Sequence, residues 1–453
     1  MHTPSPAGGH AHAAPSASSI SDTTVQKQPK RAAAAAFMGT AIEYYDFYIY
    51  ALASALIFGQ LFFKTDNVFI GTMASFATFA IGLFIRPIGG IFFGHIGDKI
   101  GRKKSLMITL FLMGISTVCI GLLPTFEQAG IIAPILLIVL RLVQGLAVGG
   151  EWGGAVLIAG EHAPTGRRAF FASFAQLGSP AGLILATLAF KLITSMPEED
   201  FLSYGWRLPF LASFAMLIVG FLIRHGVHES PEFLEEQQKK QTQPATQVPL
   251  MELFKESKAV IGLALCANVL GVAGFYFATT FMVAYTTQFA GMDKAMILDA
   301  MLIVAILHFF NTPIAAYFGE KLGTRKFLII TSAICAITPF LMFPLVLKGS
   351  LGWVALGLWL PMWCMSSFYS LVAGFTSSLF PVHLRYSGIS VAYQMCSAVA
   401  GGLTPLIATS IAQQSGGSTM VLSLFFTLLC VISCVAVVKL HPKKYPMYWI
   451  SGL

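Results

Sequence analysis

Long apolar runs separated by short polar breaks dominate the pattern of the chain. Each run is close to the roughly 20 residues that an α-helix needs to cross the hydrocarbon core of a bilayer. The runs do not alternate apolar with polar residues, which favours helices over a β-barrel. We therefore predict an all-α membrane protein with about twelve transmembrane helices, near residues 35–62, 69–93, 104–124, 133–160, 169–194, 207–226, 259–289, 296–318, 326–347, 351–380, 387–412 and 418–440.

The longest polar stretch between these spans divides them into two sets of six. Residues 1–30 are small and polar and lack the apolar core of a signal peptide, so a disordered tail is expected there. The predicted organisation is a cytoplasmic tail at 1–34, a six-helix half at 35–226, a cytoplasmic linker at 227–258, a second half at 259–440 and a cytoplasmic tail at 441–453.

Composition and charge support this assignment. Of the residues, 56% are hydrophobic and 11% are charged, whereas soluble proteins carry about 25% charged residues. Of the 28 lysines and arginines, 21 fall on one set of alternate loops and tails and 5 on the other, while Arg86 and Arg141 lie inside spans. Basic residues accumulate on the cytoplasmic side, so both termini are predicted to be cytoplasmic. Topology thus accounts for the net charge of +8, and no nucleic-acid partner is expected.

An internal repeat links the two halves. The segment GDKIGRKK at 97–104 follows the second span, and GEKLGTRK at 319–326 follows the eighth, at an offset of 222 residues. Two parallel halves joined by a linker are the organisation of one large class of transporters.

The segment GHIGDKIGRKK at 94–104 resembles the cytoplasmic loop motif of the major facilitator superfamily. Its glycines permit a tight turn and close helix approach, and Asp98 can pair with Arg102 or with a helix end. The resemblance implies a major facilitator fold with a cytoplasmic gate. The residues that it places at this gate are Gly94, Gly97, Asp98, Gly101, Arg102, Lys103, Glu161, Arg168, Glu232, Glu320, Arg325 and Arg385.

Further segments narrow the resemblance. EYYDF (43–47), RLVQGLAVGGEWGGA (141–155), GWRLPFLASF (205–214) and FPVHLRYSGISVAYQ (380–394) are similar to the metabolite:proton symporters of that superfamily, which include shikimate, 2-oxoglutarate, citrate and proline/betaine transporters. The resemblance implies proton-coupled uptake of a small organic anion or zwitterion across the cytoplasmic (inner) membrane by alternating access. LGSPAG (177–182) partly resembles the Gly-Pro signature of superfamily antiporters, so a proton-driven exporter stays an alternative.

Ionisable residues at membrane depth are costly and mark functional sites. Glu43 and Asp46 share one face of the first span, and the orientation places both in its cytoplasmic part. Arg141, Gln144, Val148 and Glu151 share a stripe of the fourth span, while Gly145, Gly149 and Gly153 form a second stripe that suits close packing.

Two interpretations of these charges are open. In the first, Arg141 binds a substrate carboxylate in a central cavity and Glu43, Asp46 or Glu151 carries the proton. In the second, Asp46 and Arg141 form a static ion pair that locks the helices together. Arg86 is interpreted as structural, and His308 as either a proton relay or a core histidine.

Carrying the 222-residue offset across suggests that the first half supplies charge and the second supplies aromatic and amide contacts. The predicted substrate-binding residues are Tyr45, Tyr50, Arg141, Gln144, Gln176, Asn268, Tyr276, Trp363, Tyr393 and Gln394. An enzyme is disfavoured because no Walker A, metal-pair or serine-elbow motif occurs. A channel is disfavoured by the repeat and the paired gate motifs. No cofactor or metal is expected, and the protein is expected to be a monomer in the lipid bilayer.

Overall fold

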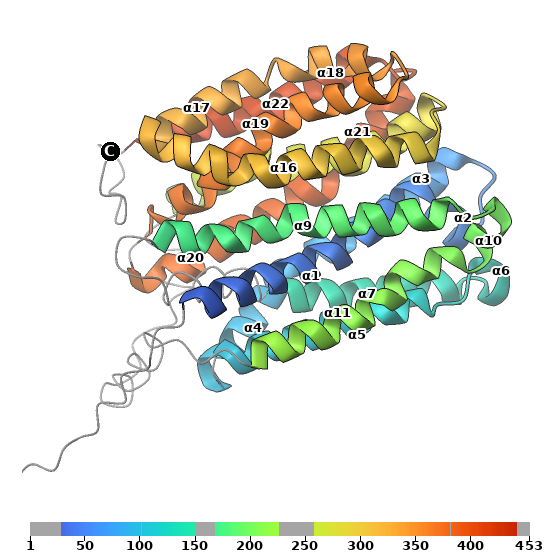
Figure 1. The fold of residues 1–453 in the computed structure, drawn as a ribbon, viewed down its shortest axis with the longest axis horizontal. Coiled ribbons are helices and arrows are strands. Elements are labelled where there is room, and N and C mark those ends of the chain that lie inside the picture. Colours follow the sequence, from blue (N-terminus) through green and yellow to red (C-terminus); the bar gives the residue numbers. More distant parts are fainter. Residues whose placement is uncertain (1–28, 101, 150–167, 226–257, 381, 442–453) are drawn as a thin grey trace, which may run out of the picture.

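The computed structural model describes residues 29–100, 102–149, 168–225, 258–380 and 382–441. Every regular element within these ranges is a helix. Among the described residues, ten helices are long and apolar enough to cross a membrane, and the pair Thr324–Cys335 and Thr338–Val346, bent by 43°, makes an eleventh span if it crosses as one. The 28-residue helix Pro29–Leu56, which carries Glu43 and Asp46, runs alongside these spans (Figure 1). The all-α prediction with about twelve spans is confirmed.

Helices from the first half of the described chain form one bundle, which we call the N half (Figure 1). They are α1 (Pro29–Leu56), α2 (Phe58–Phe62), α3 (Val68–Phe84), α4 (Arg86–Ile100), α5 (Arg102–Gly121), α6 (Phe126–Ala129), α7 (Ile132–Gly149), α9 (Arg168–Thr194), α10 (Glu198–Ser203), the 3₁₀-helix η1 (Gly205–Arg207) and α11 (Leu208–His225).

The remaining helices form the C half. They are α14 (Lys258–Val269), η2 (Leu270–Gly274), η3 (Phe277–Phe281), α15 (Met282–Ala284), η4 (Tyr285–Phe289), α16 (Lys294–Leu322), α17 (Thr324–Cys335), α18 (Thr338–Val346), α19 (Leu351–Ser377), α20 (Val382–Cys396), η5 (Ser397–Gly401), α21 (Gly402–Gln414) and α22 (Thr419–Lys439). The segments η2 to η5 are π-helical turns, which often occur at functional sites.

The outer surface of the bundle is apolar. Large hydrophobic side chains such as Leu192, Leu222 and Phe310 are 60% or more exposed. Exposing so much apolar surface to water would be unfavourable, whereas the hydrocarbon tails of lipids are as apolar as these side chains. Polar side chains gather inside instead, where 39 polar or charged residues of the described part of the chain, Asp46 and Arg141 among them, are buried.

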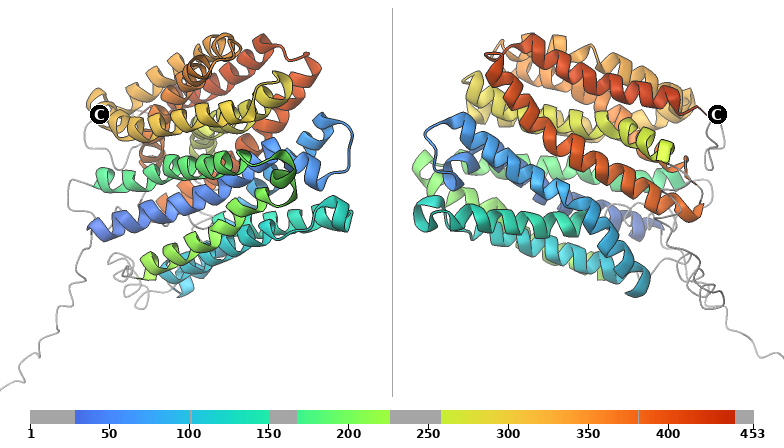
Figure 2. Two further views of the ribbon diagram at one scale, coloured as in Figure 1. Left: turned by 45° about the vertical axis from the view of Figure 1, so that its right-hand side comes forward. Right: turned by 180° about the vertical axis from the view of Figure 1, so that it is seen from behind.

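The two halves meet along several helix pairs. α9 of the N half lies beside α16 of the C half, and α3 and α4 contact α21 and α20 (Figures 1 and 2). The start of α1 and the end of α22 lie at one end of the bundle, which we call the terminal end (Figure 1).

Polar contacts join the halves at the opposite end. The ammonium of Lys191 near the end of α9 pairs with the carboxylate of Asp299 on α16. The hydroxyl of Thr72 on α3 donates to Gln288 Oε1 on η4 at 2.8 Å, and Gln288 Nε2 donates to the carbonyl of Ala55 at 2.9 Å. The halves are therefore held together at this end.

Glycines on α7 allow the closest helix contacts in the N half. A Cβ atom at Gly145 would lie 2.0 Å from the carbonyl oxygen of Gly82, and one at Gly149 would lie 2.1 Å from that of Arg86. Such separations are impossible for real side chains, so the glycines are required for α7 to pack on α3 and α4. The predicted packing role is confirmed for Gly145 and Gly149, while Gly153 lies outside the described residues.

Candidate functional site

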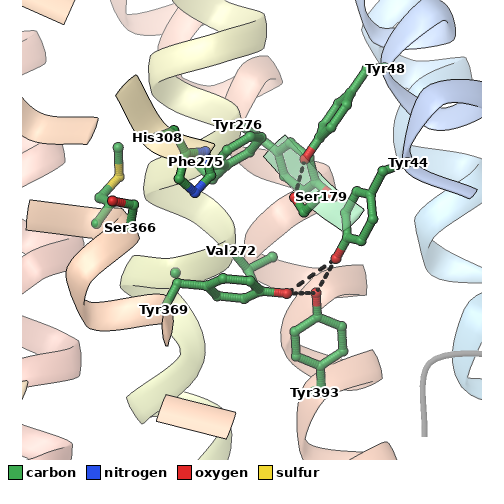
Figure 3. A pocket seen from close by; sticks show the side chains of 12 residues that line it. Tyr44, Tyr48, Ser179, Val272, Phe275, Tyr276, His308, Ser366, Tyr369 and Tyr393 are labelled. Carbon is green, nitrogen blue, oxygen red and sulfur yellow. Dashed lines mark hydrogen bonds between the residues drawn. The ribbon is translucent and has the colours of Figure 1, made fainter. Parts of the chain in front are cut away.

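A central cavity lies between the halves. The N half contributes side chains from α1 and α9, and the C half contributes side chains from η2, α16, α19 and α20 (Figure 3). The lining residues are Tyr44, Tyr48, Ser179, Gly271, Val272, Phe275, Tyr276, His308, Met365, Ser366, Tyr369 and Tyr393.

Three phenol hydroxyls converge at one side of this cavity. Tyr44 Oη lies 3.2 Å from Tyr369 Oη and 3.4 Å from Tyr393 Oη, and the last two oxygens are 3.3 Å apart. Figure 3 shows the three side chains arriving from separate helices. Because Tyr44 belongs to the N half and its partners to the C half, this tyrosine cluster ties the halves together at the cavity. Each hydroxyl can also donate to or accept from a bound molecule.

The opposite side of the cavity carries His308 and Ser366 (Figure 3). His308 is 3% exposed, and its Nδ1 atom has no hydrogen-bond partner within the described residues. Asn311, one turn further along α16, donates to the hydroxyls of Ser366 and of Ser367, the latter at 3.0 Å. Asn311 therefore fixes the position of Ser366, and the cavity presents a polar pole at which a ligand can bond.

A second, smaller cavity lies inside the N half. It is the more highly charged of the two. We call it the N-half cavity, and its lining residues are Glu43, Phe47, Gly82, Arg86, Met113, Arg141, Gln144, Gly145 and Val148. The predicted polar stripe of α7 therefore faces one space, as expected for Arg141, Gln144 and Val148, while Glu151 lies outside the described residues.

Arg141 is held tightly in this cavity. Its guanidinium lies 3.7 Å from the ring centroid of Tyr50, a cation–π contact, and Nη2 donates to the carbonyl of Phe79 at 3.3 Å. Nη1 donates to Gln144 Oε1. The phenol of Tyr50 is fixed in turn by a 2.6 Å hydrogen bond to Thr78. In this conformation Arg141 lines the N-half cavity and not the central cavity.

Glu43 and Asp46 lie near the middle of α1. α1 begins at Pro29, several residues before the expected start of the span, and the depth of the two acids in the membrane stays a prediction. Both side chains are buried, with 6% and 1% exposure. Glu43 faces the N-half cavity, whereas Asp46 accepts hydrogen bonds from Thr117 at 3.0 Å and from Ser213 at 2.6 Å.

Aromatic rings separate the two cavities. Phe47 lines the N-half cavity and its ring centroid lies 5.4 Å from that of Tyr276, which lines the central cavity. Phe79 contacts both rings. The guanidinium of Arg86 lies 4.7 Å from the Phe47 ring centroid on the N-half side.

Several predicted binding residues lie elsewhere. Trp363 is 47% exposed on the apolar outer face, so it is no longer a candidate ligand, and the ungapped offset that selected it is too crude. Tyr45 donates to the carbonyl of Pro209 at 2.8 Å, which ties α1 to α11. Asn268 donates to the carbonyl of Ala264 in its own helix at 2.8 Å, and Gln176 is buried but lines neither cavity.

Gln394 has an inter-half contact in place of a cavity position. Its Nε2 donates to the carbonyl of Gly149 at 3.2 Å, from α20 to the end of α7. Tyr276 and Tyr393 are thus the predicted C-half residues that the structure brings to the central cavity. A Cβ atom at Gly401 would lie 2.8 Å from the Tyr276 ring, so this glycine makes room for the tyrosine.

Most predicted gate residues lie outside the part of the chain that the structure describes. They are Gly101, Glu161 and Glu232, together with the side chains of Asp98, Arg102, Lys103, Arg168 and Arg385 and the surroundings of Gly94 and Gly97 on α4. In the C half, Glu320 is exposed. Arg325 donates to the carbonyls of Val437 and Val438 at 3.3 and 2.7 Å, and thereby caps the end of α22.

Sequence reasoning missed several residues of the site. Tyr44 and Tyr369 carried no signal, since tyrosines in apolar spans are common packing residues. Thr117 and Ser213 are single hydroxyls within apolar runs, and the sequence does not show that both face Asp46. The structural interpretation of Arg86 is incomplete, because this residue lines the N-half cavity together with Glu43 and Arg141.

The sequence pattern described as Major Facilitator Superfamily matches residues 36–405, which is most of the chain. The chain belongs to the major facilitator superfamily. This match spans both halves, and it confirms the resemblance carried by the loop motif.

Characterised relatives share much of the sequence. The chain is 37% identical over 421 residues to the shikimate transporter of Escherichia coli strain K12, covering 92% of this chain and 95% of that protein. It is 36% identical over 418 residues to the inner membrane metabolite transport protein YhjE of the same strain, covering 91% and 94%. It is 32% identical over 399 residues to that strain's proline/betaine transporter, covering 85% and 78%.

Solved structures agree on the fold. The xylose transporter XylE from E. coli, in a partially occluded inward open conformation, aligns with a TM-score of 0.73 at 17% identity, covering 91% of this chain and 98% of that one. These comparisons establish a multi-pass membrane transporter with a small-molecule substrate and exclude an enzyme.

Proposed function

We propose that the protein imports a small organic anion or zwitterion together with protons. The observation that carries the proposal is the tyrosine cluster, in which Tyr44 of one half bonds Tyr369 and Tyr393 of the other beside the central cavity. A site shared by two halves is exposed to either side of the membrane when the halves rock, which is the basis of alternating access.

The chemistry of the central cavity suits a ligand rich in oxygen. Three phenol hydroxyls lie on one side, and His308 with Ser366 lies on the other. Carboxylate and hydroxyl groups accept hydrogen bonds from phenols, and the rings of Phe275 and Tyr276 supply apolar contact area. The names of the relatives, which include shikimate and proline/betaine transporters, are consistent with such ligands.

The charges of the N half offer a basis for proton coupling. Among the described residues, Glu43 and Asp46 balance Arg86 and Arg141 when both acids are ionised. Protonation of one acid leaves this cluster with a net charge of +1. Because opposite charges attract strongly at low dielectric, an anionic group in the neighbouring central cavity is bound more tightly when the proton is present.

The proposed direction is import, with both termini cytoplasmic as the distribution of lysine and arginine predicts. Transport in right-side-out and inverted vesicles under an imposed pH gradient tests this direction. Shikimate, glycine betaine and proline serve as probes. Accumulation in right-side-out vesicles with an acidic exterior is expected for one of them. Accumulation in inverted vesicles driven by an acidic interior would instead identify a proton-driven exporter.

The segment LGSPAG does not add weight to the exporter. A Cβ atom at Gly178 would lie 2.6 Å from Thr40 Cβ, and one at Gly182 would lie 2.7 Å from Tyr44 Cβ. Close packing of α9 on α1 is therefore enough to account for both glycines.

A further inference from the structure

Hydrogen bonds form a continuous chain between the cation and the acid of the N half. Arg141 Nη1 donates to Gln144 Oε1, and Gln144 Nε2 donates to Thr117 Oγ1 at 2.8 Å. Thr117 Oγ1 donates in turn to Asp46 Oδ2 at 3.0 Å. The chain crosses α7, α5 and α1, and each of its four side chains is 3% exposed or less.

The chain has a direction. Every bond runs from the positive guanidinium towards the carboxylate, so each donor polarises the next. Asp46 holds a further donor on its other oxygen, the hydroxyl of Ser213 at 2.6 Å. Ser213 lies on α11 and takes no part in the link to Arg141.

Thr117 has two acceptors within reach of its one hydrogen. Asp46 Oδ2 and the carbonyl oxygen of Met113 both lie at 3.0 Å. An ionised carboxylate is the stronger acceptor, and it takes the hydrogen. A protonated Asp46 can instead donate to Thr117 Oγ1, and the threonine hydrogen then turns to Met113. The series of hydrogen bonds then no longer ends on a negative charge, and the hydrogen bond from the Arg141 guanidinium to Gln144 weakens.

We propose that Thr117 and Gln144 are positioning residues that transmit the protonation state of Asp46 to Arg141. The inference rests on the proton coupling proposed above. When a proton arrives at Asp46, Gln144 holds Arg141 less strongly and the guanidinium is free to move; when the proton leaves, the hydrogen bond from Arg141 to Gln144 is strengthened again.

Other titratable groups surround this chain. Glu43, Tyr45 and Tyr50 project from α1, and Arg86 from α4 faces Glu43 and Arg141 across the N-half cavity. Among the described side chains, α5 and α11 bring hydroxyls to Asp46. Thr117 therefore stands between the acid and the cation and is itself uncharged, so its substitution changes the link without changing the charge.

The test compares two substitutions that each remove one donor to Asp46. Thr117→Val keeps the shape of the side chain but breaks the link to Arg141, whereas Ser213→Ala leaves the link in place. Purified variants in proteoliposomes are assayed for substrate exchange at equilibrium and for accumulation driven by a pH gradient. The probe is whichever of shikimate, glycine betaine and proline the wild type accumulates.

Both variants are expected to move the midpoint of the exchange pH profile to higher pH, because each removes a donor to the ionised acid. Thr117→Val is expected to lower accumulation about tenfold more than exchange, a factor that corresponds to one lost hydrogen bond to a charged group. Ser213→Ala is expected to lower both to the same extent, and Thr117→Ser is expected to restore coupling.

Equal losses of accumulation in Thr117→Val and Ser213→Ala would overturn the relay, as would a wild-type pH profile and coupling in Thr117→Val. Either result leaves proton-coupled transport itself intact, whereas failure of the wild type to respond to a pH gradient would refute the proposed function. Gln144→Met breaks the same link from α7 but leaves the Thr117 donor to Asp46 in place. It is expected to lower accumulation relative to exchange as Thr117→Val does, so the question is answered even when one variant fails to fold.

Discussion

The guanidinium of Arg141 lies against the backbone of Gly82, where a Cβ atom would stand 2.5 Å from Nη2. The space that Arg141 occupies is therefore created by a residue without a side chain on α3. Gly82→Ala is expected to displace the guanidinium, because the end of a long side chain moves more easily than a helix. Transport should fall severalfold while the protein stays folded in the membrane. Wild-type uptake by Gly82→Ala would show that the position of Arg141 is unimportant.

Gly145 provides the contrasting case on α7. A Cβ atom there would meet the carbonyl oxygen of Gly82 at 2.0 Å, and backbone cannot rotate away. Gly145→Ala is expected to force the helices apart at a cost of about 1–3 kcal/mol or more, which is typical of overpacking. Thermal unfolding in detergent checks this. A melting temperature equal to that of the wild type would contradict the packing role.

The tyrosine cluster predicts an effect on affinity. Tyr369→Phe removes one of three converging hydroxyls and leaves the ring in place. The KM for substrate is expected to rise about five- to tenfold, the equivalent of about 1–1.5 kcal/mol for one hydrogen bond. Tyr285→Phe is the matched control, since its hydroxyl bonds the carbonyl of Gly417 at 3.0 Å and does not line the cavity. A larger effect in the control would argue against the cavity as the binding site.

The ion pair between Lys191 and Asp299 predicts a shift of conformation. Exposed pairs contribute about 0.2–1 kcal/mol, which changes a population by up to about fivefold. Lys191→Asp should therefore open the end of the bundle that this pair closes, and the double variant with Asp299→Lys should restore closure. Spin labels at the exposed residues Ser195 and Ala295 report the separation of the halves. An unchanged distance distribution in Lys191→Asp would show that this ion pair does not keep the halves closed at this end of the bundle.

The pattern of apolar runs was sufficient to predict the fold. Few backbone structures can cross a bilayer, because each span must form its backbone hydrogen bonds within the protein. It was also sufficient to find the charged stripe of α7, since helical periodicity places Arg141 and Gln144 on one face. Periodicity fixes which residues share a face but does not fix what that face meets across the bundle.

The central cavity could not be predicted in this way, because it is formed by contacts between residues of the two halves. Tyr44 and Tyr393 are 349 residues apart in the sequence. The residues next to Tyr44, Tyr369 and Tyr393 give no sign that these three side chains meet. Trp363 failed for the converse reason: the offset of the repeat is an average, and the rotation of α19 placed this ring outside the bundle. π-Helical turns such as η2 change the register of a helix and weaken any ungapped comparison of the halves.

The two acids of α1 can be distinguished by their surroundings. Asp46 receives hydroxyl donors from α5 and α11 and is linked to Arg141, whereas Glu43 faces the N-half cavity. Asp46→Asn imitates the protonated acid permanently. It is expected to reduce accumulation under a pH gradient to the level of de-energised vesicles while exchange continues. Glu43→Gln is expected to keep its response to the gradient. The reverse pattern would assign the proton to Glu43, and loss of both responses would indicate that the acids act as a pair.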